Sequence, residues 1–338
     1  MKRLKKTFST YLAASLLLVL SFRAFATVDI RVVDVGPGLC VLATDTVNDK
    51  HVLYDAGRWT NSYCYDYVVD KVERDISLVV ISHSDSDHFS NLPDILEQKE
   101  AELIVHTGYK RRMTTWHAAN HSIAMAAKKG STVINLQSTS LDMMVSPIVI
   151  GDMTIEFVYG LGEWDVNKGR LSESHLRNAL SIVVRLSAHG KEVLLAGDTV
   201  GRHDGDPQDS CLYAEQDMVT AVTRDKLEAD VLIAPHHGAD NASSSCFLEA
   251  VSPTYVIYSA GHRYNHPREV TARRTLTTLG IPQTNIFRTD RGDDEGDLEW
   301  DFQRIPGCSD RAGDDDVSIE LSATRLHVSY VNPLNECE

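Results

Sequence analysis

The most informative run in this chain is Val79-Val80-Ile81-Ser82-His83-Ser84-Asp85-Ser86-Asp87-His88, an apolar segment that leads directly into four side chains able to bind metal. The apolar part predicts a buried β-strand over residues 78–81. The first polar residues after a buried strand lie at the edge of the sheet, where α/β proteins usually bind their ligands. A polar loop that only solvates a strand end is the simpler interpretation, but this density of ligand side chains favours a metal site.

The spacing of these four side chains favours two metal ions over one. His83 and Asp85 are two residues apart and can reach one point, whereas the adjacent Asp87 and His88 diverge and can reach a second point nearby. Imidazole and carboxylate ligands together suit Zn²⁺, Mn²⁺ or Fe. The run contains no cysteine, which argues against a closed structural zinc site.

Two other apolar runs end in side chains of the same kind. Asp198 follows the run 193–197, and the pair His236 and His237 follows the run 231–235. A carboxylate at a buried strand end needs a cation or a hydrogen-bond donor to offset its desolvation, and sharing between two metal ions would provide this. The alternative for Asp198 is a helix N-cap. Of the two histidines, strand register favours His236 as a ligand and leaves His237 beside the metal or facing the substrate.

These motifs resemble, in type and in order, those of the metallo-β-lactamase fold. The pattern H-x-[HD]-x-D-H after an apolar strand resembles the metal loop of that fold, and Asp at its third position is similar to the hydrolase domain of ComEC-type competence (DNA-uptake) proteins. Further segments match at residues 34–38, 53–57, 178–184, 193–198, 231–238, 266–267 and 288–290. The matches extend from about residue 29 to residue 296, and such collinearity is far more specific than any one motif.

The resemblance implies a fold and a set of metal ligands. The fold would be of the α/β class, a four-layer αββα sandwich, and the site would hold two divalent metal ions, Zn or Mn. The implied ligands are His83, Asp85, Asp87, His88, Asp198 and His236. Asp55 would orient one of them, and Asn178 stands, as in ComEC-type relatives, where lactamase-type relatives have a histidine. Because Asp85 and Asn178 supply oxygen in place of imidazole, they favour Mn²⁺ or Mg²⁺ at the first position, with His175 as an alternative ligand.

The N-terminus predicts a signal peptide over residues 1–26. Four basic residues lie before position 7, an apolar segment spans 11–20, and Ala24-Phe25-Ala26 has the small side chains of a cleavage site. An uncleaved membrane anchor is the alternative, although the segment is short for a membrane span. No other apolar segment approaches the length of a transmembrane helix. We therefore expect a periplasmic or secreted protein without a stable membrane span after cleavage.

All six cysteines lie after residue 26, and their even number suits an oxidising compartment. Six cysteines allow about fifteen connectivities. We expect Cys308 to pair with Cys337, which would hold the tail, and Cys40 and Cys64 are candidates for a second pair. The alternative role for a cysteine is that of a buried small apolar residue, which suits Cys40 inside its apolar run.

Length, composition and charge predict one acidic domain, which the resemblance identifies as a hydrolase domain. Removing residues 1–26 would take away five basic residues and no acidic one, so the formal charge would change from −15 to −20. Such a surface repels polyanions at long range and argues against a broad nucleic-acid cradle. The basic cluster Lys110-Arg111-Arg112 could face a phosphate or form a solvated helix start.

No linker divides residues 27–305, and residues 306–338 would form an acidic C-terminal extension held by a disulfide. Helices are expected over residues 67–74, 92–99, 114–129, 215–227, 245–251 and 268–279.

Together these features predict a secreted metal-dependent hydrolase that uses a metal-bound hydroxide. Asp87 would lie at the reacting centre, and His237 or His266 would assist the leaving group. A structural role in a turn is the alternative for His266. The ComEC-like pattern favours a phosphodiesterase or nuclease that acts on a small-molecule or nucleic-acid phosphodiester. Hydrolysis of a β-lactam, lactone or other small ester is one alternative, which Asp85 and Asn178 disfavour. A non-catalytic, metal-stabilised binding protein is the other, and the intact ligand motifs argue against it.

Overall fold

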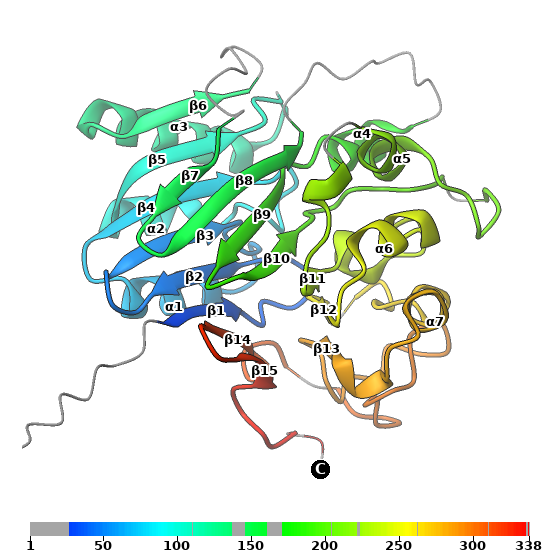
Figure 1. Cartoon of the computed structure of the whole chain (residues 1–338). Helices are drawn as coiled ribbons and strands as arrows, with labels where there is room; N and C mark the ends of the chain where they lie inside the picture. The colour runs from blue at the N-terminus through cyan, green and yellow to red at the C-terminus, as the bar shows by residue number, and fades with distance from the viewer. Residues whose placement is uncertain are drawn as a thin grey trace, which may run out of the picture.

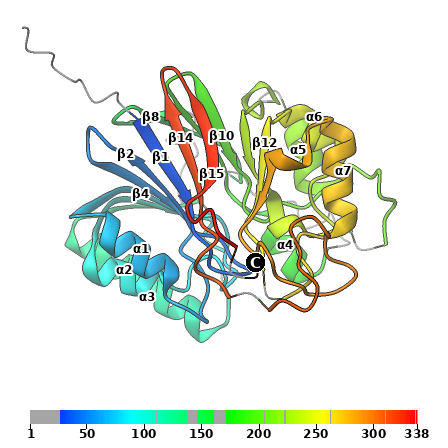
Figure 2. The ribbon, with the colours of Figure 1, turned by 90° about the horizontal axis from the view of Figure 1, so that it is seen from below.

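The structure, a computed structural model, describes residues 27–109, 111–136, 146–160, 171–203, 205–221, 224–261, 263–309, 311–335 and 337. Two β-sheets pack face to face, and helices cover the outer face of each sheet (Figure 1 and Figure 2). This arrangement is the four-layer αββα sandwich that the sequence predicted. The expected signal peptide, residues 1–26, lies outside the described residues.

The first sheet has eight strands in the order β15-β14-β1-β2-β3-β4-β5-β6. Its strands are β1 (Thr27–Val32), β2 (Val41–Asp45), β3 (Lys50–Tyr54), β4 (Asp75–Ile81), β5 (Glu100–His106), β6 (Thr132–Asn135), β14 (Val317–Ser322) and β15 (Leu326–Tyr330). Strands β3 to β6 run parallel, and the pairs from β15 to β3 are antiparallel. The loop of the predicted metal ligands follows β4, at the carboxyl end of the parallel part.

The second sheet has seven strands in the order β13-β12-β11-β10-β9-β8-β7. Its strands are β7 (Ile148–Ile150), β8 (Met153–Tyr159), β9 (Val183–Ala188), β10 (Lys191–Leu195), β11 (Val231–Ile233), β12 (Tyr255–Tyr258) and β13 (Ile286–Arg288). Strands β10 to β13 are parallel, and the pairs from β7 to β10 are antiparallel. Asp198 follows β10 and the histidine pair follows β11, so this sheet brings its ligands to one edge as well.

Strand β4 shows how the core is built. Its side chains alternate between the two faces of the sheet, as the pleat of a strand requires. Leu78 and Val80 belong to the core between the two sheets, whereas Val79 and Ile81 pack into the layer under the helices. Both faces are therefore buried, which explains why this strand is a continuous apolar run in the sequence.

Helices α1 (Tyr63–Lys71), α2 (Leu92–Gln98) and α3 (Thr114–Lys129) cover the first sheet, and α5 (Tyr213–Thr220), α6 (Ser245–Val251) and α7 (Glu269–Leu279) cover the second (Figure 2). The expected helices over 114–129 and 245–251 have the observed bounds. The helix expected over 215–227 ends at Thr220, because Ala221 adopts an extended backbone, and a short 3₁₀ segment, η2 (Arg224–Lys226), follows. Two further 3₁₀ segments are η3 (Pro235–Gly238) and η4 (Gln283–Asn285). Helix α4 (Glu173–Ala179) was not expected.

The C-terminal segment 306–338 contributes to the first sheet. Strand β14 pairs antiparallel with β1, and β15 pairs with β14. The expected disulfides Cys308–Cys337 and Cys40–Cys64 are both present, and Cys211 pairs with Cys246. Among the described helices, none is both long and apolar enough to cross a membrane.

Candidate metal centre

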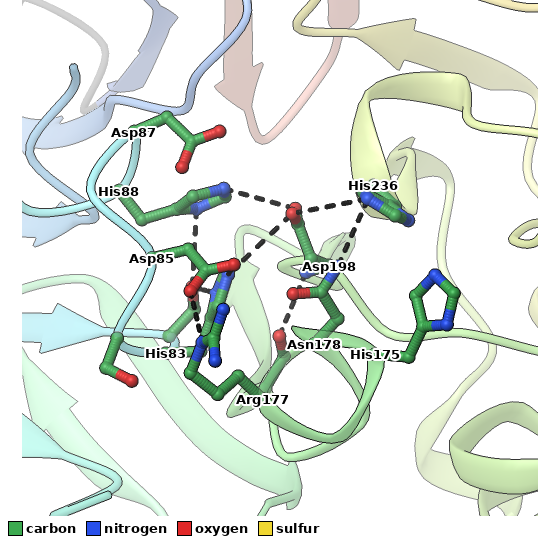
Figure 3. Close-up of polar contacts among 12 residues, drawn as sticks. His83, Asp85, Asp87, His88, His175, Arg177, Asn178, Asp198 and His236 are labelled. Atoms are coloured by element: carbon green, nitrogen blue, oxygen red, sulfur yellow. Dashed lines mark hydrogen bonds and ion pairs between the residues drawn. The ribbon is translucent and has the colours of Figure 1, made fainter. Parts of the chain in front are cut away.

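The predicted ligand residues gather where strands of both sheets end (Figure 3). The loop after β4 supplies His83, Asp85, Asp87 and His88, the residues after β10 supply Asp198, and η3 supplies His236 and His237. Gly38, in the turn before β2, lies against this loop: a Cβ atom there would stand 2.7 Å from the backbone oxygen of Asp87. The glycine of the 34–38 motif therefore lets two backbone segments meet beside the ligands.

Asp55, at the end of β3, organises the loop after β4. Its carboxylate accepts hydrogen bonds from the backbone N–H of Ser82 and from Ser82 Oγ, both at 2.7 Å. The same carboxylate lies 2.7 Å from His88 Nδ1. A proton on Nδ1 satisfies this contact and leaves the Nε2 lone pair of His88 directed into the site.

Four side chains then converge on one point. His88 Nε2 lies 3.2 Å from Asp198 Oδ1 and 3.3 Å from His237 Nε2. His237 Nε2 lies 3.5 Å from Asp198 Oδ1 and 3.8 Å from Asp87 Oδ2. The Nδ1 atom of His237 donates to the backbone oxygen of Ser259 at 2.7 Å, which fixes the tautomer with Nε2 free to bind metal.

The two adjacent histidines differ in what their nitrogens contact. His236 Nδ1 lies 2.8 Å from Asn241 Oδ1, and His236 Nε2 accepts from Asn178 Nδ2 at 3.1 Å. Both nitrogens of His236 thus have protein partners, and its side chain is 20% exposed. Strand register reaches neither histidine, since β11 ends at Ile233 and both histidines have left-handed backbone conformations in η3. His236 Nε2 lies 4.0 Å from Asp198 Oδ2, and its assignment as a ligand stays a prediction. His237 is the member of the pair that joins a group of potential ligand atoms, with Asp87 and His88.

A second group of potential ligands consists of His83, His88 and Asp198. His83 is buried, and burial followed by the neighbouring His88 imidazole lowers the pKa of His83, so its ring is held neutral. Its Nδ1 lies 3.0 Å from Ser82 Oγ, whereas its Nε2 is buried without a hydrogen-bond partner and lies 3.7 Å from Asp198 Oδ2. A neutral imidazole with a free Nε2 is suited to bind a cation.

Asp85 has a different environment from the other carboxylates. Its Oδ1 accepts from Arg177 Nε at 2.5 Å and from Arg111 Nη1 at 2.7 Å, while its Oδ2 lies 3.9 Å from His83 Nε2. Burial raises the pKa of Asp85, but His83, Arg177 and Arg111 together outweigh it and hold the pKa below the ordinary value. Asp85 is therefore an ionised carboxylate that two guanidinium groups already neutralise. Arg177 was missed by the sequence analysis, although it directly precedes Asn178 of the third motif.

The donor set fits divalent cations. Burial raises the pKa of Asp198, but the imidazoles of His88, His237 and His236 hold it well below its usual range. Nε2 of His83 and Oδ1 of Asn178 are both buried without a hydrogen-bond partner among the described residues. Buried polar atoms that converge without partners are costly unless a cation binds them. Mixed imidazole and carboxylate donors suit Zn²⁺ or Mn²⁺.

The centre opens into a cavity of about 460 Å³, whose wall includes Arg111, His175, Tyr264, His266 and Arg268. His266 is buried, and its ring stacks on that of His237 at a centroid distance of 6.4 Å. Burial, and then the imidazoles of His236 and His237, hold the pKa of His266 well below its usual value. His175 borders the cavity but belongs to neither ligand group found among the described residues.

Comparisons with known proteins identify the family of this chain. The family model of the metallo-beta-lactamase superfamily matches residues 33–262. Competence protein ComA of Neisseria gonorrhoeae is 33% identical over 123 residues, which are 33% of this chain and 14% of that protein. ComE operon protein 3 of Bacillus subtilis (strain 168) is 20% identical over 248 residues, which are 71% of this chain and 26% of that protein. The chain thus spans only a small part of the length of these two relatives. Among solved structures, the metallo-beta-lactamase fold protein YhfI from Bacillus subtilis is similar with a TM-score of 0.47 and 13% identity, covering 78% of this chain and 97% of that one.

Proposed function

Because the chain belongs to the metallo-beta-lactamase superfamily, we propose that it is a secreted metal-dependent hydrolase that cleaves phosphodiesters, as a phosphodiesterase or a nuclease. The observation that carries this proposal is the convergence of Asp87, His88, Asp198 and His237 at the wall of a cavity. Cavities of about 300–1,000 Å³ typically accept small molecules or parts of larger ones. The geometry therefore supports a site where a substrate meets a metal centre.

We assign the tighter of two divalent ions, Zn²⁺ or Mn²⁺, to Asp87, His88, Asp198 and His237, whose metal-facing atoms are oriented by other protein groups. The second ion would be held by His83, Asp85 and Asp198. It would bind more weakly, because Asp85 already pairs with two arginines and the metal would have to compete with them.

Divalent ions at these positions would activate a water molecule as the nucleophile and stabilise negative charge on the oxygens of the substrate. The protein residues have separate tasks. Arg111 and Arg268 border the cavity and would bind the anionic diester. His266 is kept neutral by burial, and its buried Nδ1 atom has no hydrogen-bond partner, so this ring would contact the substrate as a neutral hydrogen-bonding group.

Two features support a phosphodiester over a lactam or another small ester. Asp85 and Asn178 supply oxygen atoms where lactamase-type relatives carry imidazoles, which favours harder ions that often bind phosphate oxygens. In addition, the metal-loop pattern resembles that of competence (DNA-uptake) proteins, and one similar curated protein is named a competence protein.

Secretion is supported by the three disulfides. All six cysteines are paired, at Cys40–Cys64, Cys211–Cys246 and Cys308–Cys337. Such bonds persist in the periplasm or outside the cell and are rare in the cytosol.

The test is hydrolysis of bis(p-nitrophenyl) phosphate and of linear single-stranded DNA by the purified protein. The protein is first stripped with a chelator and then given Mn²⁺ or Zn²⁺. We expect activity that returns with metal in the natural chain and is absent from the Asp87→Ala plus His88→Ala variant. The DNA reaction distinguishes a nuclease from an enzyme for small diesters.

The matched control is His121→Ala, which also removes an imidazole, but from an exposed position on α3. It should keep full activity. If the natural chain binds metal yet cleaves neither substrate, the phosphodiesterase proposal is wrong and lactam, lactone and thioester substrates become the next to test.

A further inference from the structure

Two large aromatic side chains stand exposed at the cavity that contains the metal centre. Trp59 is 50% exposed and Tyr264 is 51% exposed, and both line this cavity. Single exposed apolar residues are common and need no explanation. Two aromatic rings that border the same polar cavity are a stronger signal, because aromatic rings at a binding site present flat apolar faces to a ligand.

An arginine covers one face of each ring. Arg58 Cζ lies 5.1 Å from the centroid of the Trp59 ring, and Arg263 Cζ lies 4.9 Å from that of Tyr264. Such cation–π contacts favour one placement of each ring. Arg58 itself is buried. Trp59, Tyr264 and Asp87 of the metal loop line the same cavity, so the two aromatic–arginine pairs lie at the wall that also contains the metal loop.

The backbone around Tyr264 fixes this ring at the cavity. Tyr264 and Asn265 both have positive φ, at 79° and 53°, which non-glycine residues rarely adopt. The Glu295 carboxylate accepts from the Asn265 backbone N–H, and Asn265 Nδ2 donates to the Glu295 backbone oxygen. Unusual backbone conformations persist where the surrounding structure holds them, and they occur often at ligand sites.

Aromatic rings also lead from Tyr264 to the metal centre. The Tyr264 ring lies 5.9 Å from that of His266 with an interplanar angle of 33°. The His266 ring in turn lies 6.4 Å from that of His237 with an angle of 19°. His237 Nε2 belongs to the group with Asp87 and His88. A flat ligand on Tyr264 would thus have its attached phosphate close to the proposed metal ions.

The local charge suits a small anion. The chain as a whole carries a formal charge of −15, yet Arg111 and Arg268 line the cavity and Arg58 and Arg263 lie at its aromatic residues. Long polyanions would meet repulsion from the rest of the surface. The cavity wall also contains Asp85, Asp87, Asp198 and Asp240, so a short nucleotide ligand would depend on the arginines together with the metal ions proposed above.

We propose that Trp59 and Tyr264 form a base-stacking subsite that binds the nucleobases flanking the scissile phosphodiester. This inference rests on the proposed function and narrows it to nucleotide diesters, such as dinucleotides or the end of a single strand. Stacking on aromatic faces accepts any base, so the subsite would select nucleotides without selecting a sequence. A phospholipid diester has no flat ring to stack and would gain nothing from it.

The test is calorimetric binding to the full, metal-loaded chain. The first probe is a thymidine dinucleotide joined by a non-hydrolysable methylenephosphonate, and the second is the same compound with both bases replaced by hydrogen. We expect Trp59→Ala and Tyr264→Ala each to weaken binding of the first probe about ten- to hundred-fold and to leave the second unchanged. Trp59→Phe and Tyr264→Phe keep a ring and should retain most of the affinity. Leu298→Ala is the control, since Leu298 is exposed and apolar but does not line the cavity.

Three outcomes would overturn the subsite: an equal loss for both probes, no loss for either, or the same loss for a short-chain phosphatidylcholine. Hydrolysis of the natural dinucleotide is measured separately. If binding depends on the two rings but no hydrolysis occurs, the subsite stands and the hydrolase proposal fails. If hydrolysis occurs but binding ignores the bases, the hydrolase proposal stands and the subsite fails.

Discussion

Two buried clusters of charged side chains in this molecule differ in how completely their polar atoms are hydrogen-bonded. At the end of β13, the fully buried Arg288 donates to both carboxylate oxygens of Asp290, to Glu299, and to the backbone oxygens of Trp300 and Phe302. At the candidate metal centre, carboxylates and imidazoles face one another, and His83 Nε2 and Asn178 Oδ1 are buried without a hydrogen-bond partner among the described residues. A buried charged group whose hydrogen-bond partners all come from the protein has a structural role. Ligand atoms that converge without such partners indicate a bound cation instead.

The largest effect that this comparison predicts is on folding stability. Arg288→Met removes the cation and leaves Asp290 and Glu299 buried without their partner, so the free energy of unfolding should fall by about 3–5 kcal/mol. Chemical denaturation measures this change. Arg273→Met is the control, because Arg273 forms a solvent-exposed pair with Glu269 and its loss should leave the free energy of unfolding nearly unchanged. A loss below about 1 kcal/mol for Arg288→Met would show that the Arg288 cluster is not the structural unit described.

A smaller effect is expected at the metal centre. Asp55→Asn keeps the shape of the side chain but removes the charge that orients His88 and Ser82, so affinity for the tighter metal should fall about 10- to 100-fold. Metal titration of the stripped protein measures this affinity. The Arg288→Met variant, in its folded fraction, should bind metal as the natural chain does. Unchanged metal affinity in Asp55→Asn would contradict the orienting role of Asp55.

The smallest effect concerns pH, and it lies beside the Arg288 cluster. Burial, with the nearby carboxylates of Asp290, Asp293 and Glu299, raises the pKa of Glu295 to about 7. The folded state therefore keeps a proton that the unfolded chain releases near its ordinary pKa of about 4.5, so stability should fall as pH rises from about 4.5 to 7. Denaturation of the natural chain and of Glu295→Gln across this range tests the sign. The free energy of unfolding of the variant should change less with pH than that of the natural chain. If the natural chain instead gains stability between pH 4.5 and 7 relative to the variant, the raised pKa of Glu295 is wrong.

Much of the fold was accessible from local sequence patterns. Strand β4 is apolar on both faces and so is a continuous apolar run, and α3 has the bounds that its periodicity predicted. The pairing of Cys308 with Cys337 followed from the even number of cysteines and an otherwise unattached tail. Helix α4 was missed because residues 178–184 matched a strand of the resembled family, whereas β9 begins only at Val183.

The roles of individual site residues were less accessible. Strand register pointed to His236, but η3 turns the chain through two left-handed residues, and register holds only while the strand continues. Asp85 looked equivalent to the other carboxylates of its loop until Arg111 and Arg177, from distant segments, were seen to neutralise it.

The order and type of residues along the chain thus indicated a candidate metal centre, because apolar runs and the ligand types at their ends are local properties, and the collinear motifs carried the family resemblance that implied the αββα architecture. Only the tertiary structure decided which histidine nitrogen faces the centre, which carboxylate is already paired, and which aromatic rings border the cavity. Each of these depends on contacts between segments far apart in sequence, and such contacts exist only after the two sheets have packed together.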